Sequence, residues 1–200
     1  DISEMVRDSF LEKAAIIQTS IAKNIGIEEL KDEILTRSNK IKTKYDRGFF
    51  RMPVDRSFTI KGYGTVVTGT VISGEKSVGD IIDVMPNKEQ YKIRGIHSHE
   101  KSVNKISIGS RAAINISNLN IENIYRGHQI ASIGYLKSIK SFIAYCSLLE
   151  TSKKKLKQNQ RIRIHIGTSE VIGRVSLVDI EELNPGGNCI LLMKLESTII

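Results

Sequence analysis

Short runs of β-branched and apolar residues follow one another at regular intervals, and they constrain the fold more than any other feature of the chain. Between Tyr45 and Tyr135 they read SFTI, TVVTGTVISG, DIIDVMP, YKIRGIHS, SRAAINIS and HQIASI, with Gly, Asn and Asp between them. Strands at this spacing are typical of a β-sandwich or a small closed barrel. Gly69, inside one run, predicts a bend at a barrel corner, and VGD at 78–80 predicts a tight turn.

A second series of such runs begins near Tyr135 and comprises SFIAYCSLLE, RIRIHIGT, VIGRVSLVD and CILLMKLE. The run RIRIHI alternates strictly, which predicts that Arg161, Arg163 and His165 lie on one face of a strand and three isoleucines on the other. The last residues, LESTII, end within apolar material and carry no turn signal. We therefore expect a second barrel that is incomplete and has an exposed edge.

The first residues, up to about Thr43, have a helical pattern instead. The run AAIIQTS predicts a short apolar strand, and IGIEELKDEIL predicts a helix that follows it. Apolar residues recur at helical spacing in both flanking segments, namely Ile2, Met5, Val6, Phe10 and Leu11 before the strand and Ile27, Leu30, Ile34 and Leu35 after it. Such a unit is typical of the last step of a larger α/β sheet. The first residue is not Met, so we expect the chain to begin partway through a larger protein.

Composition narrows the class of partner. The chain of 200 residues has 30 Lys and Arg against 22 Asp and Glu, a formal net charge of +8, which favours a polyanionic partner. No run approaches the 18 or so apolar residues of a membrane span, and the first residues do not form a secretion signal, so we expect a cytoplasmic protein and no membrane partner. Cys146 and Cys189 lie far apart in sequence and make no metal-binding pair, which indicates buried reduced thiols.

Specific phrases carry a resemblance to a known family. The stretch DRSFTIKGYGTVVTGTVISGEKSVGD, followed by KIRGIHSHE, GSRAAINI and RGHQIA, resembles the second domain of the selenocysteine-specific elongation factors, which are translational GTPases. The phrase GTVVTGTVISG is shared with elongation factor Tu, whereas DR at 55–56 and GSR at 109–111 are the selective part. The resemblance implies a mainly β fold of two antiparallel barrels, with 1–45 as the end of a GTPase domain, 46–134 as barrel domain II and 135–200 as most of barrel domain III.

The resemblance implies a pocket for the 3′ end of a tRNA. In the family, the positions that match Ile60 and Val66 line an apolar slot for the terminal adenine, and the position of His97 lies near the terminal ribose. An unpaired base gains free energy from stacking and apolar burial, and a barrel surface keeps the walls rigid. The alternative is that Ile60 and Val66 are ordinary core residues.

The selective residues imply a pocket for the amino acid itself. Where elongation factor Tu has an acid and an amide, this chain has Arg56 and Arg111. A selenol is more acidic than the thiol of cysteine, whose pKa is about 8.5, so two guanidinium groups would attract an ionised selenocysteine and gain little from serine. Asp55 would hold the two arginines together, and His99 would lie near the aminoacyl group. The alternative is a structural salt bridge at a domain edge.

Further basic and histidine residues admit two interpretations each. In the family the third domain touches the tRNA backbone, which implies such contacts for Lys154, Arg161 and Arg163; a solvated hairpin tip is the alternative for the KKKLK at 153–157. His97 and His99, two apart on a strand, would share a face, but a metal site lacks a third ligand and we predict no metal.

Nucleotide chemistry belongs to the parent protein in this interpretation. SIAKNIGIEEL resembles the last guanine-contacting loop of the GTPase domain; Ser20 fits, but Ile21 stands where Ala is usual. The chain has no GxxxxGK[ST], DxxG or NKxD motif, so GTP and Mg are expected as cofactors of the intact parent and none for this chain. No catalytic residue is predicted, because no nucleophile and base occur in a supporting arrangement.

The implied partners are selenocysteyl-tRNA, the ribosome and, through a C-terminal domain outside this chain, an mRNA hairpin; DNA is not expected. Three alternatives stay open. The first is another translational GTPase that handles ordinary aminoacyl-tRNA, the second is a barrel-containing GTPase subunit such as a sulfate-activating enzyme, and the third is an RNA-binding barrel in its own right.

Overall fold

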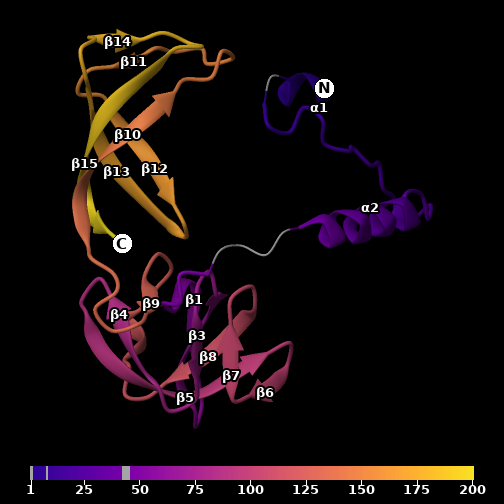
Figure 1. Ribbon diagram of the computed structural model, residues 1–200, viewed down its shortest axis with the longest axis vertical. Helices are drawn as coiled ribbons and strands as arrows, with labels where there is room; N and C mark the ends of the chain where they lie inside the picture. Colours follow the sequence, from indigo (N-terminus) through magenta and orange to yellow (C-terminus); the bar gives the residue numbers. More distant parts are fainter. Residues whose placement is uncertain (1, 8, 42–45) are drawn as a thin grey trace. The chain divides into compact units, whose positions relative to one another are not determined.

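The computed structural model describes residues 2–7, 9–41 and 46–200, and Figure 1 traces them. These residues divide into two compact units, one before Asp46 and one from Asp46 to Ile200. The first unit contains helices α1 (Ile2–Met5) and α2 (Ile27–Lys40). The second contains every described strand.

In the first unit, the predicted helix after residue 26 is confirmed by α2, whereas the predicted strand AAIIQTS is wrong. Residues 14–19 pair with no other described segment, and Ser20 makes only an isolated bridge to Ile25. The backbone N–H and C=O groups of a strand must pair with those of a neighbouring strand. The apolar character of a run does not provide that neighbour. The early helical pattern yields only the one-turn α1, followed by turns.

Helix α2 exposes the apolar face that the sequence gives it. Leu30 is 37% exposed, Ile34 58% and Leu35 60%, and no residue of the helix is buried. An amphipathic helix gains most of its stability by packing its apolar stripe against another element. Among the described residues of the first unit, none covers this stripe.

The second unit begins with a closed antiparallel barrel. Its strands are β1 (Arg51–Ile60), β2 (Gly64–Thr70), β4 (Ile81–Met85), β5 (Glu89–Ser98), β8 (Arg111–Ile116) and β9 (Gln129–Ala131). They follow the order β4-β9-β1-β2-β8-β5, and pairing of β4 with β5 closes the ring. The predicted first barrel is therefore confirmed.

Shorter elements decorate the barrel. Strand β6 (Lys101–Val103) extends the sheet beside β5, strands β3 (Glu75–Ser77) and β7 (Lys105–Ser107) form a small ribbon, and a 3₁₀ turn covers Ile121–Asn123. The predicted turn at 78–80 is confirmed, since the Asp80 amide donates to the Ser77 carbonyl at 3.2 Å.

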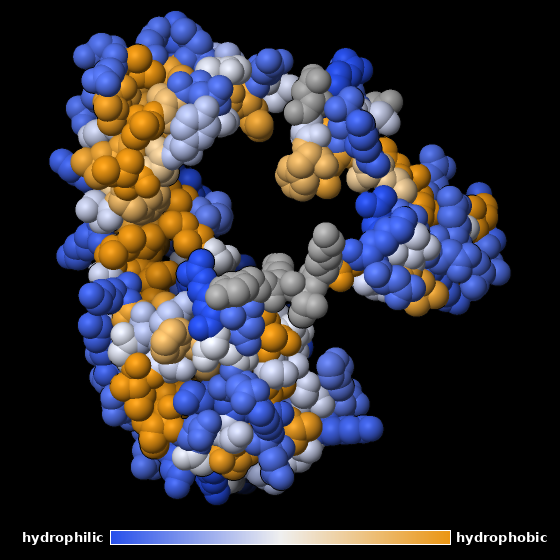
Figure 2. All heavy atoms as spheres, viewed as in Figure 1, coloured by the Kyte–Doolittle hydropathy of each residue, from blue (hydrophilic) through white to orange (hydrophobic). Residues whose placement is uncertain are grey.

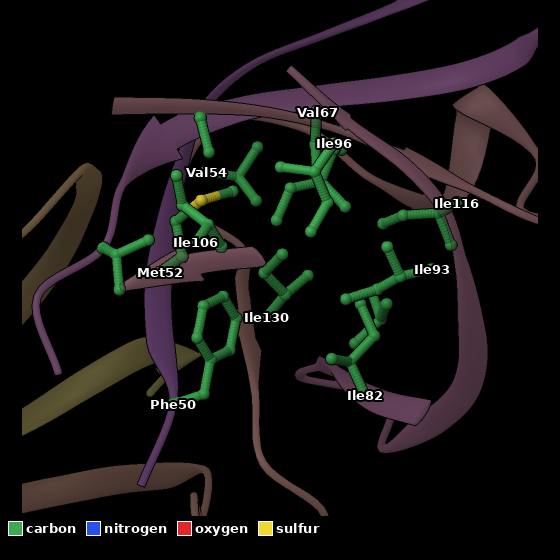
Figure 3. Close-up of a cluster of buried hydrophobic side chains, with 14 of the residues drawn as sticks. Phe50, Met52, Val54, Val67, Ile82, Ile93, Ile96, Ile106, Ile116 and Ile130 are labelled. Carbon is green, nitrogen blue, oxygen red and sulfur yellow. The ribbon is translucent and has the colours of Figure 1, made fainter. Parts of the chain in front are cut away.

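Inward-pointing side chains from successive strands fill the barrel (Figure 3). The largest fully buried ones are Phe50, Met52, Val54, Val67, Ile82, Ile93, Ile96, Ile114, Ile116, Ile124 and Ile130. Burying each such side chain stabilises the fold by roughly 1.5–3 kcal/mol. The packed interior makes the barrel wall a rigid base for whatever lies on its outer face.

A β-bulge interrupts the pairing of β1 with β2. Val54 lies opposite Gly69 and Arg56 opposite Thr68, so Asp55 is an extra residue without a partner. At Gly69 a Cβ atom would lie 2.2 Å from the Pro53 carbonyl oxygen and 2.9 Å from Met52 Cγ. Only glycine lets the two backbones approach this closely, so the predicted special position of Gly69 has a steric cause.

The Gly69→Ala variant should be destabilised by about 1–3 kcal/mol, because the added methyl must displace the backbone of β1 at the bulge. Urea unfolding of the variant and of wild type would measure the difference. Gly95→Ala is the matched control, since a Cβ at Gly95 meets nothing within 4 Å. Equal unfolding midpoints for Gly69→Ala and wild type would contradict this account of the bulge.

From residue 135 onward the chain forms an open sheet. Its strands are β10 (Ile139–Ser147), β12 (Arg161–Ile166), β13 (Ser169–Leu177) and β15 (Asn188–Ile199), in the order β10-β15-β13-β12. The strands β11 (Leu156–Lys157) and β14 (Glu182–Leu183) form a separate ribbon. Within the described residues this sheet does not close on itself, so β10 and β12 are its edges.

The alternation predicted for RIRIHI is confirmed. Arg161, Arg163 and His165 are exposed, and the intervening isoleucines pack against a second core of apolar side chains. The face of this sheet that points away from the second core also carries exposed apolar groups, including Ile143 (73%), Tyr145 (72%) and Ile190 (52%). Figure 2 shows hydrophobic atoms gathered on the visible surface of this region. Cys146 lies directly opposite Cys189, and both are free, half-buried thiols.

Candidate nucleic-acid interface

Four neighbouring barrel strands, β1, β2, β8 and β5, build one continuous outer face. Arg56, Thr68, Ala113 and His97 lie directly opposite one another across these strands. Directly opposed residues of an antiparallel sheet point to the same side. Arg56 and His97 are exposed, so this row of side chains faces outward.

The next row contributes the wall of an apolar cavity. Phe58, Val66, Asn115 and Gly95 are opposed in the same way. The cavity has a volume of about 520 Å³ and is lined by Phe58, Ile60, Tyr63, Val66, Arg94, Gly95, His97, Ser102, Ala113 and Asn115. The fold thus brings together the three residues predicted for the tRNA 3′ end.

The interpretation of these residues as ordinary core does not fit their positions. Ile60 is 42% exposed. Val66 is buried, but it lines the outer cavity and is absent from the cluster of side chains that fills the barrel, to which its neighbour Val67 belongs. An apolar cavity open to solvent on a rigid wall is the usual form of a small-ligand site.

A group of three charged residues, Asp55, Arg56 and Arg111, adjoins this cavity along the same strands, and we call it the charged corner. The bulge turns Asp55 to the outer face, where its Oδ1 accepts a hydrogen bond from Thr68 Oγ1 at 2.6 Å. Its Oδ2 lies 2.5 Å from Arg111 Nη1, and the Asp55 side chain is only 26% exposed. Arg111 stands opposite Thr70 at the start of β8. The carboxylate is therefore held at both oxygens.

The electrostatics of this corner follow from these contacts. Partial burial acts to raise the pKa of Asp55, but hydrogen bonds from Arg111 and Thr68 and the charges of Arg111 and Arg56 together lower it below its ordinary value. The hydrogen bond to Asp55 raises the pKa of Arg111. Two guanidinium groups and one carboxylate give the corner a net charge of +1, so it favours an anion.

The two histidines do not share a strand face, contrary to the interpretation of HSH as two positions on one strand. His97 lies within β5, whereas His99 follows its end in a turn with φ 49°. His99 Nδ1 lies 3.1 Å from Ser98 Oγ, which donates to the Arg111 carbonyl at 2.8 Å. Within the described residues no three His, Cys, Asp or Glu side chains cluster as metal ligands would.

The basic residues predicted to contact RNA on the second sheet are partly engaged. Arg161 makes two hydrogen bonds to Glu196, at 2.7 and 2.6 Å, and Arg163 lies 3.2 Å from Glu170. Lys154 is exposed in the loop before β11. Exposed ion pairs contribute little stability, so a phosphate could replace the acid, but these contacts stay a prediction.

The loop predicted to contact guanine closes on itself. The Ser20 amide donates to the Ile25 carbonyl at 3.0 Å, and its hydroxyl accepts from the Lys23 amide at 3.3 Å. Ile21 is 90% exposed. The Ser20 amide is therefore occupied within the loop, which leaves it no hydrogen for a base.

Sequence reasoning missed several residues of the outer face. Phe58, Tyr63, Arg94 and Asn115 line the cavity, and Thr68 orients Asp55. Alternation from Arg56 along β1 could have indicated Phe58. The others could not be assigned to this face without knowing which strands are neighbours.

No family model matches the chain. It is 33% identical, over 93% of its length, to a selenocysteine-specific elongation factor of Desulfomicrobium baculatum. Translation elongation factor SelB from Methanococcus maripaludis, in its apo form, matches 99% of the chain with a TM-score of 0.84 and 27% identity. The same factor in complex with the GTP analogue GppNHp matches 94% of the chain with a TM-score of 0.80, also at 27% identity.

The predicted resemblance to the selenocysteine-specific elongation factors is confirmed. The chain spans 29% of the Desulfomicrobium relative and 47% and 45% of the two Methanococcus chains, so less than half of each. These relatives are translation factors. In the part of the chain that the structure describes, no helix is long and apolar enough to span a membrane.

The Asp55→Asn variant should lower the free energy of unfolding at pH 7 by up to about 1 kcal/mol, because it removes a partly buried ion pair. The native pKa of Asp55 is lowered, so its stabilising effect is present above the unfolded-state pKa and is lost as the pH falls through the native pKa. Urea unfolding from pH 7 to pH 2.5 should show the difference shrinking below about pH 4.

The control for this titration is Glu122→Gln, which alters an exposed acid without a salt bridge in the described part of the barrel. It should change stability little at any pH. A difference between Asp55→Asn and wild type that stayed constant down to pH 2.5 would show that the carboxylate charge is not the stabilising feature.

Proposed function

We propose that this chain is the part of a selenocysteine-specific elongation factor that holds the 3′ end of selenocysteyl-tRNA. One observation carries the proposal: an apolar cavity and a corner of net positive charge adjoin on the outer face of one rigid barrel. An aminoacylated adenosine has the matching parts, an apolar base and, for selenocysteine, an anionic side chain.

The terminal adenine enters the apolar cavity. Phe58, Ile60 and Val66 offer apolar surface on which a base can be buried, and His97 stands between this surface and the charged corner. Such burial is insensitive to the charge of the attached amino acid. The cavity therefore supplies affinity for any intact tRNA end and no preference among amino acids.

The preference comes from the charged corner. At neutral pH a selenol is ionised while the hydroxyl of serine is neutral, so Arg56 and Arg111 attract the first and gain little from the second. At about 4 Å in a partly desolvated site, each pairing is worth up to about 4 kcal/mol before desolvation is subtracted. About 1.4 kcal/mol already corresponds to tenfold in affinity. The corner can thus separate the two amino acids on charge alone.

Asp55 serves as a positioning residue in this proposal. By pairing with Arg111 it holds the guanidinium group in one orientation and reduces its repulsion with Arg56. Thr68 in turn fixes the carboxylate. The guanidinium group of Arg111 has five N–H donors and keeps others for a ligand.

The remaining activity belongs to the whole protein. We propose that the parent binds GTP with Mg, delivers selenocysteyl-tRNA to the ribosome in the cytoplasm and recognises an mRNA hairpin through a domain outside this chain. The solved relative with a GTP analogue supports the nucleotide. Lys154, Arg161 and Arg163 are proposed as contacts to the tRNA backbone, and the loop of Ser20 and Ile21 as a remnant of the guanine-contacting loop, in which the Ser20 amide makes no contact to the base.

The Arg111→Asn variant of the complete protein encoded by the gene should lose its preference for selenocysteyl- over seryl-tRNA. The ratio of the two affinities should fall at least tenfold, because one of the two cations is removed. Protection of the aminoacyl bond from hydrolysis, measured with GTP present, reports both affinities. Lys105→Gln removes an equally exposed, paired cation elsewhere on the barrel and should leave the ratio unchanged. An unaltered ratio in Arg111→Asn would refute the pocket.

The Ile60→Ala variant tests the apolar cavity. It should weaken binding of selenocysteyl- and seryl-tRNA by the same factor, about tenfold, because it removes buried apolar surface that contacts only the base. The same protection assay measures this. Ile72→Ala is the control, since Ile72 is 43% exposed outside the cavity. If binding weakened for only one of the two tRNAs, the proposal that the cavity binds the base and the corner the amino acid would be contradicted.

A further inference from the structure

A second cavity adjoins the apolar one on the barrel. It has a volume of about 630 Å³ and lies between the β1–β2 turn and the segment that follows β8. Two residues, Tyr63 and Arg94, line both cavities. The remaining lining of the second cavity mixes polar and apolar residues and comprises Thr59, Gly64, Thr65, Ile116, Ser117, Asn118, Leu119, Asn120 and Ile121.

The side chain of Tyr63 lies on the wall between the two cavities and is largely exposed to solvent. The residue is 62% exposed. Its backbone is nevertheless fixed, because the Tyr63 carbonyl accepts hydrogen bonds from Asn115 Nδ2 at 2.7 Å and from Arg94 Nη1 at 3.3 Å. The Tyr63 amide donates to the Ile60 carbonyl at 2.9 Å. An aromatic residue whose backbone is fixed and whose ring is exposed to solvent is suited to stacking against a base.

The turn that carries Tyr63 is built to hold this position. Gly62 and Gly64 flank it with φ of 82° and 86°, a backbone region that glycine adopts without strain. Asn115, which is 7% exposed, also donates to the Thr65 carbonyl at 3.3 Å, so one buried amide group bonds two carbonyls where the turn enters β2. The wall between the cavities is therefore a fixed part of the barrel surface.

Arg94 complements Tyr63 on the same wall. It is an exposed side chain of β5, and only one of its five N–H donors is accounted for by the Tyr63 carbonyl. A guanidinium group with free donors binds phosphate well. Consecutive nucleotides of a single strand are joined by one phosphate, which must cross the wall wherever two neighbouring bases occupy the two cavities.

We propose that the second cavity binds the nucleotide preceding the terminal adenosine, with Tyr63 stacking on its base and Arg94 binding the phosphate between the two nucleotides. This inference rests on the proposed function, which puts the terminal base in the first cavity. The hydroxyl and amide groups of Ser117, Asn118 and Asn120 suit the polar edges of an unpaired base. The barrel thus binds the last two nucleotides of the acceptor end.

A double-mutant cycle tests the stacking. The complete protein, as wild type and Tyr63→Ala, is titrated with selenocysteyl-tRNA that is either intact or abasic at the penultimate nucleotide. Either change alone should weaken binding about tenfold, in line with the loss of one stacked base, and the two together should weaken it no further. Tyr63→Phe, which keeps the ring, should bind within about twofold of wild type. Tyr145→Ala, at an exposed tyrosine of the second sheet, is the control for the loss of an aromatic side chain.

The salt dependence tests the phosphate contact. Arg94→Met should reduce the slope of log Kd against log salt by about 0.7, the value for one phosphate of a single strand. Additive effects of Tyr63→Ala and the abasic nucleotide, or an unchanged slope, would overturn this inference while Ile60→Ala still weakened binding of the intact tRNA. If the wild-type protein bound neither the intact nor the abasic selenocysteyl-tRNA, the proposed function itself would be overturned.

Discussion

The outer face of the barrel depends on the bulge at Asp55. In a regular strand, neighbouring residues point to opposite faces, and one of two consecutive charged residues would point into a core of Met52, Val54 and Val67. Burying an unpaired charge there would cost far more than the barrel could offset. The extra residue lets both Asp55 and Arg56 face outward, and the close approach of β1 to Gly69 is the geometry that accommodates it. The charged corner exists because the strand is irregular at this point.

Closure of the barrel provides the second requirement, which is rigidity. Asp55 and Arg111 are 56 residues apart in sequence, yet β2 alone separates their strands in the sheet. The apolar core fixes these strands against one another, so the cavity wall and the charged corner keep a constant spacing. A ligand with an apolar base and an anionic side chain then meets both parts at once, without paying to assemble the site.

Local patterns predicted the strands well, because alternation and turn residues are properties of a few consecutive residues. RIRIHI shows its alternation in the structure as it does in the sequence. The strand predicted for AAIIQTS is wrong because an apolar run becomes a strand only beside another strand, and among the described residues this run makes only the isolated bridge of Ser20 to Ile25. The prediction that His97 and His99 share a strand face is wrong for a related reason. The end of β5 falls between them, and the end of this strand is set by its pairing with β6 and β8.

The amino-acid sequence by itself determined the succession of strands and turns, the excess of positive charge, and the phrases that relate the chain to selenocysteine-specific elongation factors. It also marked Asp55, Arg56, Arg111, Ile60, Val66 and His97 through that resemblance. Only the tertiary structure decided that the cavity and the charged corner adjoin, that Thr68 orients Asp55, and that Tyr63 and Arg94 stand between two cavities. The physical reason is that strand order and register are set by the packing of the whole barrel, and no short stretch of sequence contains that information.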